Sequence, residues 1–109
     1  MPMAKTRPDG TSVLHIEGDM SIYRAAELKA ALLTSLDQAG ELEVDLAAVT
    51  EFDTAGVQIL MLAKQQAQAM QKTLRLIRHS PAVLEVFELL NLAAYFGDPL
   101  VISSEEAFT

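Results

Sequence analysis

The chain has 109 residues, no cysteine and a formal net charge of −7 at pH 7. This length suits one domain, and we expect residues 1–109 to fold around a single core. The lack of cysteine excludes disulfides and thiol chemistry, and 15 acidic against 8 basic residues argue against nucleic acid or an anionic membrane as the main partner. The sequence begins without the apolar core of a signal peptide, and no stretch approaches ~20 apolar residues. We therefore expect a soluble cytoplasmic protein that does not insert into a membrane.

The first third of the sequence predicts a strand followed by a helix. Residues 8–10 form a turn signal, with a short edge strand before it only weakly indicated. Residues 11–17 then alternate, with Leu14 and Ile16 on the apolar face. We expect Gly18 to end this strand and Ser21 to cap a helix over residues 22–37. The other face of the strand carries Val13, His15 and Glu17.

The second half of the sequence repeats this alternation of strands and helices. Residues 42–46 predict a strand whose second face, with Glu41, Glu43 and Asp45, is acidic and solvated. A helix follows, and residues 74–78 predict a third strand. Ser80 and Pro81 are typical of a helix start, and this helix should run to about Leu90. A last strand over residues 100–102 and a terminal helix over 103–108 complete the pattern.

This element order predicts an α/β fold with one mainly parallel, mixed sheet of about four to five strands and about four helices. Each strand has a polar second face, which does not suit a sheet covered by helices on both sides. We therefore expect the helices to pack mostly on one face and the other face to be partly open. An acidic open face would oppose face-to-face pairing, so we expect a monomer or a weak dimer that pairs through its edge strand.

A strand leads into a helix at Asp53, and this junction is the central feature of the sequence. Asp53 is a good N-cap, because its carboxylate can accept hydrogen bonds from the first turn and faces the positive end of the helix dipole, together worth ~1 kcal/mol. Ala55 and Gly56 complete the first turn. Thr54 is then the first residue of this helix, directly after the cap.

The helical projection of the following residues separates a core face from a polar face. The core face is predicted to contain Ile59, Leu60, Leu62, Ala63, Ala67 and Met70. Val57 and Met61 fall instead beside Thr54, among Gln58 and Lys64. This arrangement predicts a small recognition patch with a modifiable hydroxyl at its centre. The alternative is that Thr54 is an ordinary first-turn residue, since single exposed apolar side chains are common.

No arrangement of residues predicts an enzyme, a cofactor or a metal site. The two histidines, His15 and His79, have no nucleophile near them in the sequence, and no glycine-rich phosphate loop is present. A small-molecule role is the weakest alternative and would require a polar pocket around one of these histidines. Five basic residues within sixteen positions could form a local basic area or simply a solvated helix end: Lys64, Lys72, Arg75, Arg78 and His79.

The junction motif, residues 53–56 (DTAG) followed by an apolar helix, resembles the signature of STAS domains, the family named for sulfate transporters and bacterial anti-sigma factor antagonists. Three further stretches are similar to family motifs in the same order: residues 16–20 (IEGDM), 79–83 (HSPAV) and 87–92 (FELLNL). The resemblance covers nearly the whole chain. It implies the STAS fold and a bacterial, non-enzymatic regulator that binds a protein partner.

For the antagonist branch of the family, the resemblance implies partner switching in transcription regulation. The domain binds an anti-sigma factor that is also a serine-protein kinase, and phosphorylation of the domain ends this binding. The phosphorylated hydroxyl is usually the second residue after the aspartate, which here is Ala55, so Thr54 is the remaining phosphoacceptor candidate. Ser21 stands where a second carboxylate is common. The motif is equally similar to STAS proteins linked to chemosensory kinases and to STAS subunits of Gram-negative lipid-transport ABC complexes. The implied partner-binding residues are Asp53, Thr54, Ala55, Gly56, Val57, Gln58, Met61 and Lys64.

Overall fold

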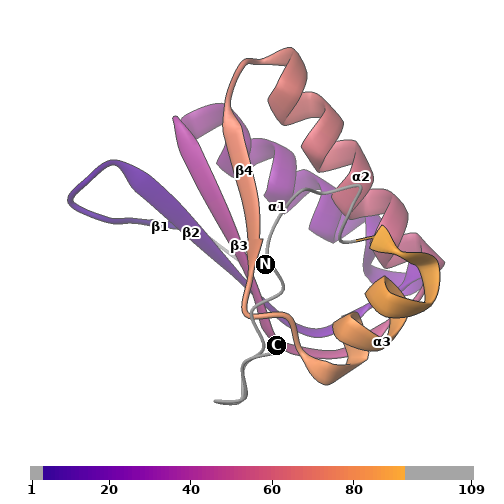
Figure 1. The fold of residues 1–109 in the computed structure, drawn as a ribbon. Coiled ribbons are helices and arrows are strands. Elements are labelled where there is room, and N and C mark those ends of the chain that lie inside the picture. The colour runs from indigo at the N-terminus through magenta and orange to yellow at the C-terminus, as the bar shows by residue number, and fades with distance from the viewer. Residues whose placement is uncertain (1–3, 93–109) are drawn as a thin grey trace.

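The computed structural model describes residues 4–92, which form a mixed sheet with helices packed against it (Figure 1). The elements in chain order are β1 (Ala4–Thr6), β2 (Thr11–Met20), the 3-10 helix η1 (Ile22–Arg24), α1 (Ala25–Gln38), β3 (Glu41–Phe52), α2 (Thr54–Ala69), β4 (Thr73–Ile77) and α3 (Pro81–Leu90). The strand expected over residues 100–102 and the helix expected over 103–108 lie outside the described residues.

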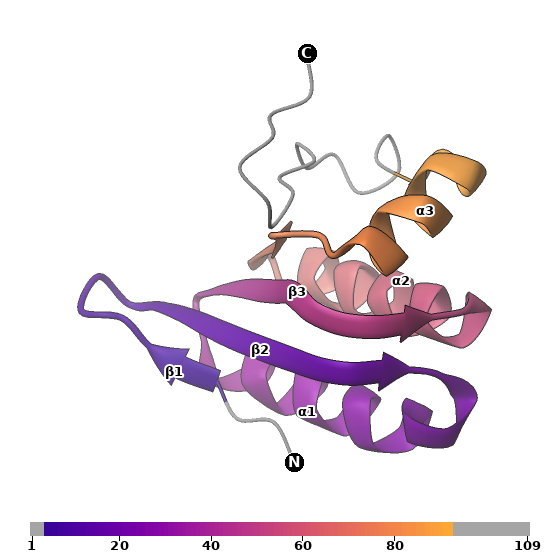
Figure 2. The same ribbon diagram turned by 90° about the horizontal axis from the view of Figure 1, so that it is seen from below.

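The sheet has the strand order β1-β2-β3-β4. Strands β2, β3 and β4 are parallel, and β1 pairs antiparallel with β2 as a short edge strand. Helices α1 and α2 lie side by side on one face of the sheet (Figures 1 and 2). The predicted α/β fold with a mainly parallel sheet is confirmed, with three α-helices in residues 4–92 where about four were expected for the whole chain.

The core lies between the sheet and the α1–α2 layer, and the period-2 pattern of each strand places it there. Leu14 and Ile16 of β2 are fully buried, as predicted. The alternate residues of the next two strands and the apolar stripes of the two helices fill the same layer: Leu42, Val44, Leu46, Leu74, Leu76, Leu28, Leu32, Leu36, Leu60, Ala63 and Ala67. Burial of this contiguous apolar cluster is the main stabilising term for the fold.

Strands β2 and β3 continue well beyond the lengths predicted from the sequence. Gly18, expected to end β2, instead takes a left-handed φ of +81°. It lies within a stretch where the register shifts twice, and pairing resumes to join Met20 with Phe52. A shift of this kind is a β-bulge, which bends a strand without ending it. Strand β4 pairs only with residues 41–45 of β3.

Helix α3 lies beside the second half of β3, on the side where β4 has ended (Figure 2). The Ser80 hydroxyl accepts a hydrogen bond from the amide of Val83 at 3.3 Å, and Pro81 occupies the first helical position, as the sequence predicted. The ring of Phe87 packs against that of Phe52 with 6.1 Å between centroids. This contact anchors α3 to the end of β3.

The predicted helix over residues 22–37 begins differently. Ser21 caps the 3-10 turn η1 by accepting from the amide of Tyr23, and the α-helix starts only at Ala25. Ile22, the first residue of the predicted helix, is 70% exposed. The tighter 3-10 turn changes the angular position of each residue, so a projection at 100° per residue does not apply there.

The sheet face away from α1 and α2, called here the outer face, is not the solvated acidic face that the alternation predicted. Glu43 is 7% exposed and Asp45 4% exposed, and Val13 is also buried. Arginines from neighbouring segments cover both carboxylates. The prediction failed because alternation shows which face a side chain is on, whereas its burial depends on what other segments place there.

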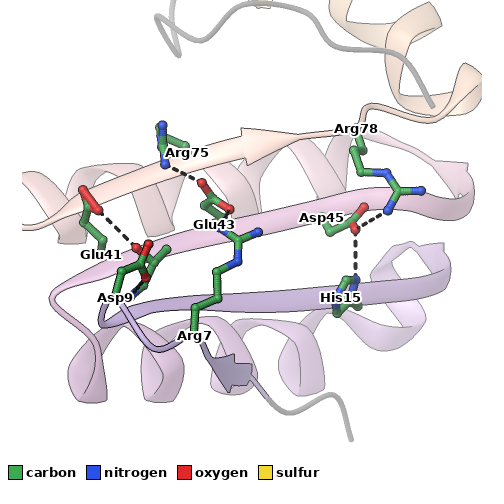
Figure 3. Close-up of polar contacts among 9 residues, drawn as sticks. Arg7, Asp9, His15, Glu41, Glu43, Asp45, Arg75 and Arg78 are labelled. Atoms are coloured by element: carbon green, nitrogen blue, oxygen red, sulfur yellow. Dashed lines mark hydrogen bonds and ion pairs between the residues drawn. The ribbon is translucent and has the colours of Figure 1, made fainter. Parts of the chain in front are cut away.

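Cross-strand ion pairs hold these two carboxylates (Figure 3). Glu43 contacts Arg7, at 2.8 Å, and Arg75. Asp45 contacts Nδ1 of His15 at 2.9 Å and the guanidinium of Arg78 at 3.2 Å. Buried carboxylates require such partners, because an unpaired charge away from water costs several kcal/mol.

Candidate functional site

The candidate site is the start of α2, where the chain leaves β3 and enters the helix. The Asp53 carboxylate accepts hydrogen bonds from the backbone amides of Ala55, at 2.9 Å, and Gly56, at 3.3 Å. Its backbone is extended, as an N-cap residue requires. The predicted capping role of Asp53 is therefore confirmed.

Gly56 is required by close packing in the first turn of α2. A Cβ atom at this position would lie 2.8 Å from the backbone carbonyl of Met20 and 2.8 Å from the ring of Phe52. The amide of Asp53 also donates to the carbonyl of Met20, at 3.4 Å. These contacts hold the helix start directly against the end of β2.

The loop after β2 is fixed to the same place. Asp19 accepts a hydrogen bond from the Ser21 hydroxyl, which lowers the pKa of its carboxyl below the usual value. Arg24 donates to the backbone carbonyl of Asp19 at 2.9 Å. The family resemblance leads one to expect a second carboxylate at position 21. Ser21 stands there instead, and its hydroxyl holds the carboxylate of Asp19, two residues earlier in the chain.

The structure separates the predicted site residues by exposure. Thr54 and Gln58 are exposed, and Met61 is half-buried on the same helix. The exposure predicted for Val57 is wrong, because this side chain is only 6% exposed and belongs to the core. Near the end of β3 the core extends further around the helix than the projection of α2 alone indicated. The side chain of Val57 therefore offers little accessible area to a partner.

Ala55 and Gly56 shape the site through the backbone rather than by presenting large side chains. Ala55 is half-buried, and Gly56 is buried. Lys64 is half-buried, and its Nζ donates to the carbonyl of Leu74 on β4 at 3.0 Å. This lysine connects α2 to the sheet, so only part of its side chain faces solvent.

Beside Thr54 lies a mainly apolar groove that the sequence did not reveal. It has a volume of about 270 Å³ and lies between the first turns of α1 and α2. Its lining residues are Ile22, Ala25, Lys29, Ala55, Gln58, Ile59 and Leu62. Ile22 and its neighbour Tyr23, which is 92% exposed, are among the exposed large apolar side chains of the molecule. Apolar side chains gathered in this way are typical of a protein contact surface.

Leu62, predicted to be a core residue, is 36% exposed and lines this groove. The signal that could have found Ile22 and Tyr23 was the Ser21 cap, which places the two residues after it in a first turn. Their exposure could not be inferred, because it depends on where η1 lies relative to α2.

The basic residues that could have formed a local basic area near the end of α2 are dispersed in the fold. Nζ of Lys72 donates to the carbonyls of Leu36, at 2.8 Å, and Asp37, at 3.0 Å, at the end of α1. Arg75 and Arg78 lie on the outer face of the sheet. His79 is fully buried, with its ring 5.2 Å from that of Phe87. The alternative of a local basic area at this helix end is therefore wrong.

Within residues 4–92, no group of three or more potential ligands is placed to hold a metal ion. No helix of the described part is long and apolar enough to cross a bilayer.

Comparison with solved structures shows which fold this arrangement represents. An anti-sigma factor antagonist from Mycobacterium paratuberculosis superposes with a TM-score of 0.78 at 24% identity, covering 93% of this chain and 84% of that one. SpoIIAA, an anti-sigma factor antagonist, in its unphosphorylated form gives 0.72 at 16% identity, covering 96% and 90%. The phosphorylated form of the Bacillus protein SpoIIAA gives 0.67 at 16% identity, covering 96% and 93%. The fold is therefore that of the anti-sigma factor antagonists.

A family model described as "Mlab, STAS domain" matches residues 3–102. The chain belongs to the STAS domain family, as its motifs indicated. Membership of this family of non-enzymatic regulatory domains confirms the expectation that the protein is not an enzyme. No curated protein sequence matches the chain significantly.

Proposed function

We propose that this STAS domain docks a kinase-fold protein, an anti-sigma factor or a chemosensory kinase, through the start of α2, and that phosphorylation of Thr54 releases the partner. The observation that carries the proposal is the exposed Thr54, which is adjacent in the chain to Ala55, a residue that lines the apolar groove together with Ile22 and Leu62. A partner that fills the groove and extends over the helix start would cover the Thr54 hydroxyl.

The electrostatics of the helix start support a switch that acts by repulsion. The Asp53 carboxylate already occupies the amides of Ala55 and Gly56. A phosphate on Thr54 would bring about two further negative charges next to this carboxylate. Because these two amides already donate to Asp53, the phosphate would find fewer hydrogen-bond donors within the domain and would remain directed at the partner surface. Burial of such a charge against apolar groups is strongly unfavourable.

A second candidate function is a constitutive accessory subunit on the ATPase of a Gram-negative lipid-transport ABC complex. The observation that favours it is Ala55, which stands where the antagonists usually carry the phosphorylated hydroxyl. In this case Thr54 would contact the ATPase permanently, and its hydroxyl would contribute to affinity rather than to control.

The two candidates predict opposite effects of substitutions at Thr54. Wild-type protein, Thr54→Ala and Thr54→Glu are used to capture partners from native cytosol, with Thr34→Glu as the matched control because Thr34 is also an exposed helical threonine. The switch predicts capture of a histidine-kinase-fold protein by wild type and Thr54→Ala, loss with Thr54→Glu, and phosphate on Thr54 in the peptide 51–64. Capture of an ABC ATPase that Thr54→Ala weakens, without phosphate, supports the accessory subunit instead.

The groove supplies an independent test of the docking surface. Ile22→Ser and Leu62→Ser should each weaken binding of the identified partner by about tenfold or more, since exposed apolar anchors of this kind contribute about 1–2 kcal/mol or more to an interface. Their thermal unfolding should remain close to that of wild type, because both side chains are at least partly exposed. Unchanged affinity in both variants would show that the partner binds elsewhere.

A further inference from the structure

The outer face of the sheet contains a second hollow, formed by residues that have no part in the α2 site. It has a volume of about 280 Å³. Its lining residues are Lys5, Thr6, Arg7, Val13, His15, Asp45, Ile77 and Arg78. We call it the outer-face hollow. It lies on the sheet face away from α1 and α2, and several of its residues are shown in Figure 3.

The charge of this hollow is opposite to that of the whole chain. Lys5, Arg7 and Arg78 supply three positive charges against the one carboxylate of Asp45, an excess of two with His15 neutral, whereas the chain carries −7. The side chains of Arg7 and Arg78 are 48% and 53% exposed although both are ion-paired. Each guanidinium has five N–H donors in a planar fork, so donors remain on its solvent side.

Carboxylates at one end of the sheet define where this positive area ends. Asp9 and Glu41 lie at the end of the sheet where the chain turns from β1 into β2 (Figure 3). Asp9 accepts from the amide of Thr11 at 2.9 Å, which lowers the pKa of its carboxyl. An acidic ligand would be repelled from that end and directed toward the hollow between Lys5 and Arg78.

The dimensions of the hollow suit an extended peptide segment. Lys5 lies in register with Glu43, and the Arg78 guanidinium lies beside Asp45, two residues further along β3. The two cations are therefore separated by two strand spacings and two residues, roughly 12 Å at about 4.8 Å per spacing and about 3.4 Å per residue. In an extended chain, residues four apart are about 14 Å apart, and the flexible Lys5 side chain accommodates the difference. A segment that crosses the strands can therefore place one carboxylate at each rim, with the residue midway between them over Val13 and Ile77.

We propose that the outer-face hollow docks an extended acidic segment of a protein partner, in which two carboxylates four residues apart flank an apolar residue. Lys5 and Arg7 bind the first carboxylate and Arg78 the second, while Asp45 and His15 hold Arg78 in place at the hollow. This surface is separate from the start of α2, so the domain has two docking surfaces.

The test uses a blocked synthetic peptide, Gly-Glu-Ser-Val-Ser-Glu-Gly, titrated into the 15N-labelled full chain at low salt. Amide shifts should concentrate at Val13, His15, Ile77 and Arg78, and a peptide with lysine in place of both glutamates should cause none. A peptide of the same composition with adjacent glutamates should bind at least about threefold more weakly. Shifts scattered over the molecule, or equal binding of the rearranged peptide, would overturn the proposal.

A matched pair of variants tests the assigned residues. Lys5→Glu should weaken the peptide about five- to tenfold, as reversal of one rim charge does in comparable interfaces. Lys29→Glu makes the same change on an exposed lysine of α1 that lines the apolar groove at the α2 site, on the opposite side of the sheet, and should not change the affinity for this peptide. Equal affinities of the two variants would contradict the assignment. Thermal unfolding of both variants establishes that they are folded.

Two further outcomes would assign the surface to another occupant and overturn the proposal. Inorganic phosphate that shifts the same amides with the affinity of the peptide would indicate a small-anion site. Concentration-dependent self-association abolished by Lys5→Glu would indicate a second copy of this chain. Failure of the Thr54 experiments leaves this test unaffected, since no residue of the hollow lies on α2.

Discussion

The start of α2 and the outer face of the sheet both place polar groups at the edge of the core, but they do so by different means. At the start of α2, Asp53 bonds to amides two and three residues further along the chain. On the outer face, Glu43 is satisfied by Arg7 and Arg75, more than thirty residues away from it in sequence on either side. The first arrangement is local and can be read from a motif, whereas the second exists only after the sheet has assembled.

Close packing at the start of α2 should give the largest effect on stability. Gly56→Ala places a methyl group against the carbonyl of Met20 and the ring of Phe52. Overpacking of this kind costs about 2 kcal/mol even after the better helix propensity of alanine is included. Gly40→Ala is the control, because a Cβ there meets no atom within 4 Å. Chemical denaturation measures both, and equal stability of the two variants would show that the first turn of α2 can move away from β2.

The outer face should respond more weakly to loss of its charge partners. In the double variant Arg7→Met and Arg75→Met, Glu43 keeps its charge but loses both cations. Loss of a fully buried partner costs 3–5 kcal/mol, and we expect about 1.5 kcal/mol here because the arginines are half exposed and water can reach the carboxylate.

Adding Glu43→Gln to this double variant should restore part of the lost stability, because it removes the unpaired charge. Chemical denaturation of the double and triple variants compares their free energies of unfolding. If the triple variant is less stable than the double, hydrogen bonding of Glu43 rather than its charge holds this face together.

The cap of α2 should have a smaller effect. Asp53→Ala removes the acceptor for two amides and should cost about 1 kcal/mol, whereas Asp53→Asn keeps an acceptor and should cost only a few tenths. Thermal unfolding separates the two variants. A loss with asparagine as large as that with alanine would mean that the charge at the helix dipole, and not the hydrogen bonds, is the stabilising part.

Acidification should produce the smallest effect, and both regions contribute to it. Asp19 beside the α2 site and Asp9 at the end of the outer face have pKa values below their usual 3.8 in the folded state, because Ser21 and Thr11 donate hydrogen bonds to them. Each of these carboxyl groups binds a proton less readily in the folded chain than in the unfolded chain. Its ionised form therefore stabilises the fold at pH values above the unfolded pKa, and this contribution is lost as the pH falls through 3.8 and below.

Ser21→Ala removes the hydrogen bond to Asp19 and should reduce the loss of stability between pH 5 and pH 3. Thermal unfolding at both pH values measures this difference. An acid sensitivity equal to that of wild type would show that the Ser21 hydroxyl does not set the pKa of Asp19.

Much of the fold could be predicted from the sequence because its signals are local. The alternation at Leu14 and Ile16, the Asp53 cap and the Ser80–Pro81 helix start each depend on neighbouring residues. The extension of β2 through Gly18 could not be predicted, because a bulge is formed by the pairing of two strands. The buried carboxylates of β3 were missed because their arginines come from other segments: Arg7 from the turn after β1, Arg75 from β4 and Arg78 from the residue after β4.

The residues at the centre of the candidate site were predicted correctly from the sequence, whereas the residues at its margin were not. Asp53 and Thr54 lie where the motif placed them. Val57 and Leu62 exchanged their expected environments, because the exposure of a helix residue depends on which neighbouring element covers it. Ile22 and Tyr23 became part of the surface only through the placement of η1 beside α2.

The position of α3 beside the second half of β3 has a consequence for aggregation. Residues 46–52 of β3 extend past the end of β4, and such a projecting strand would otherwise offer its backbone groups to the strands of another molecule. An incoming strand could pair there only after α3 had been displaced and the contact between Phe87 and Phe52 broken. The helix thus protects the long strand that leads to the α2 site from adding to a neighbouring sheet.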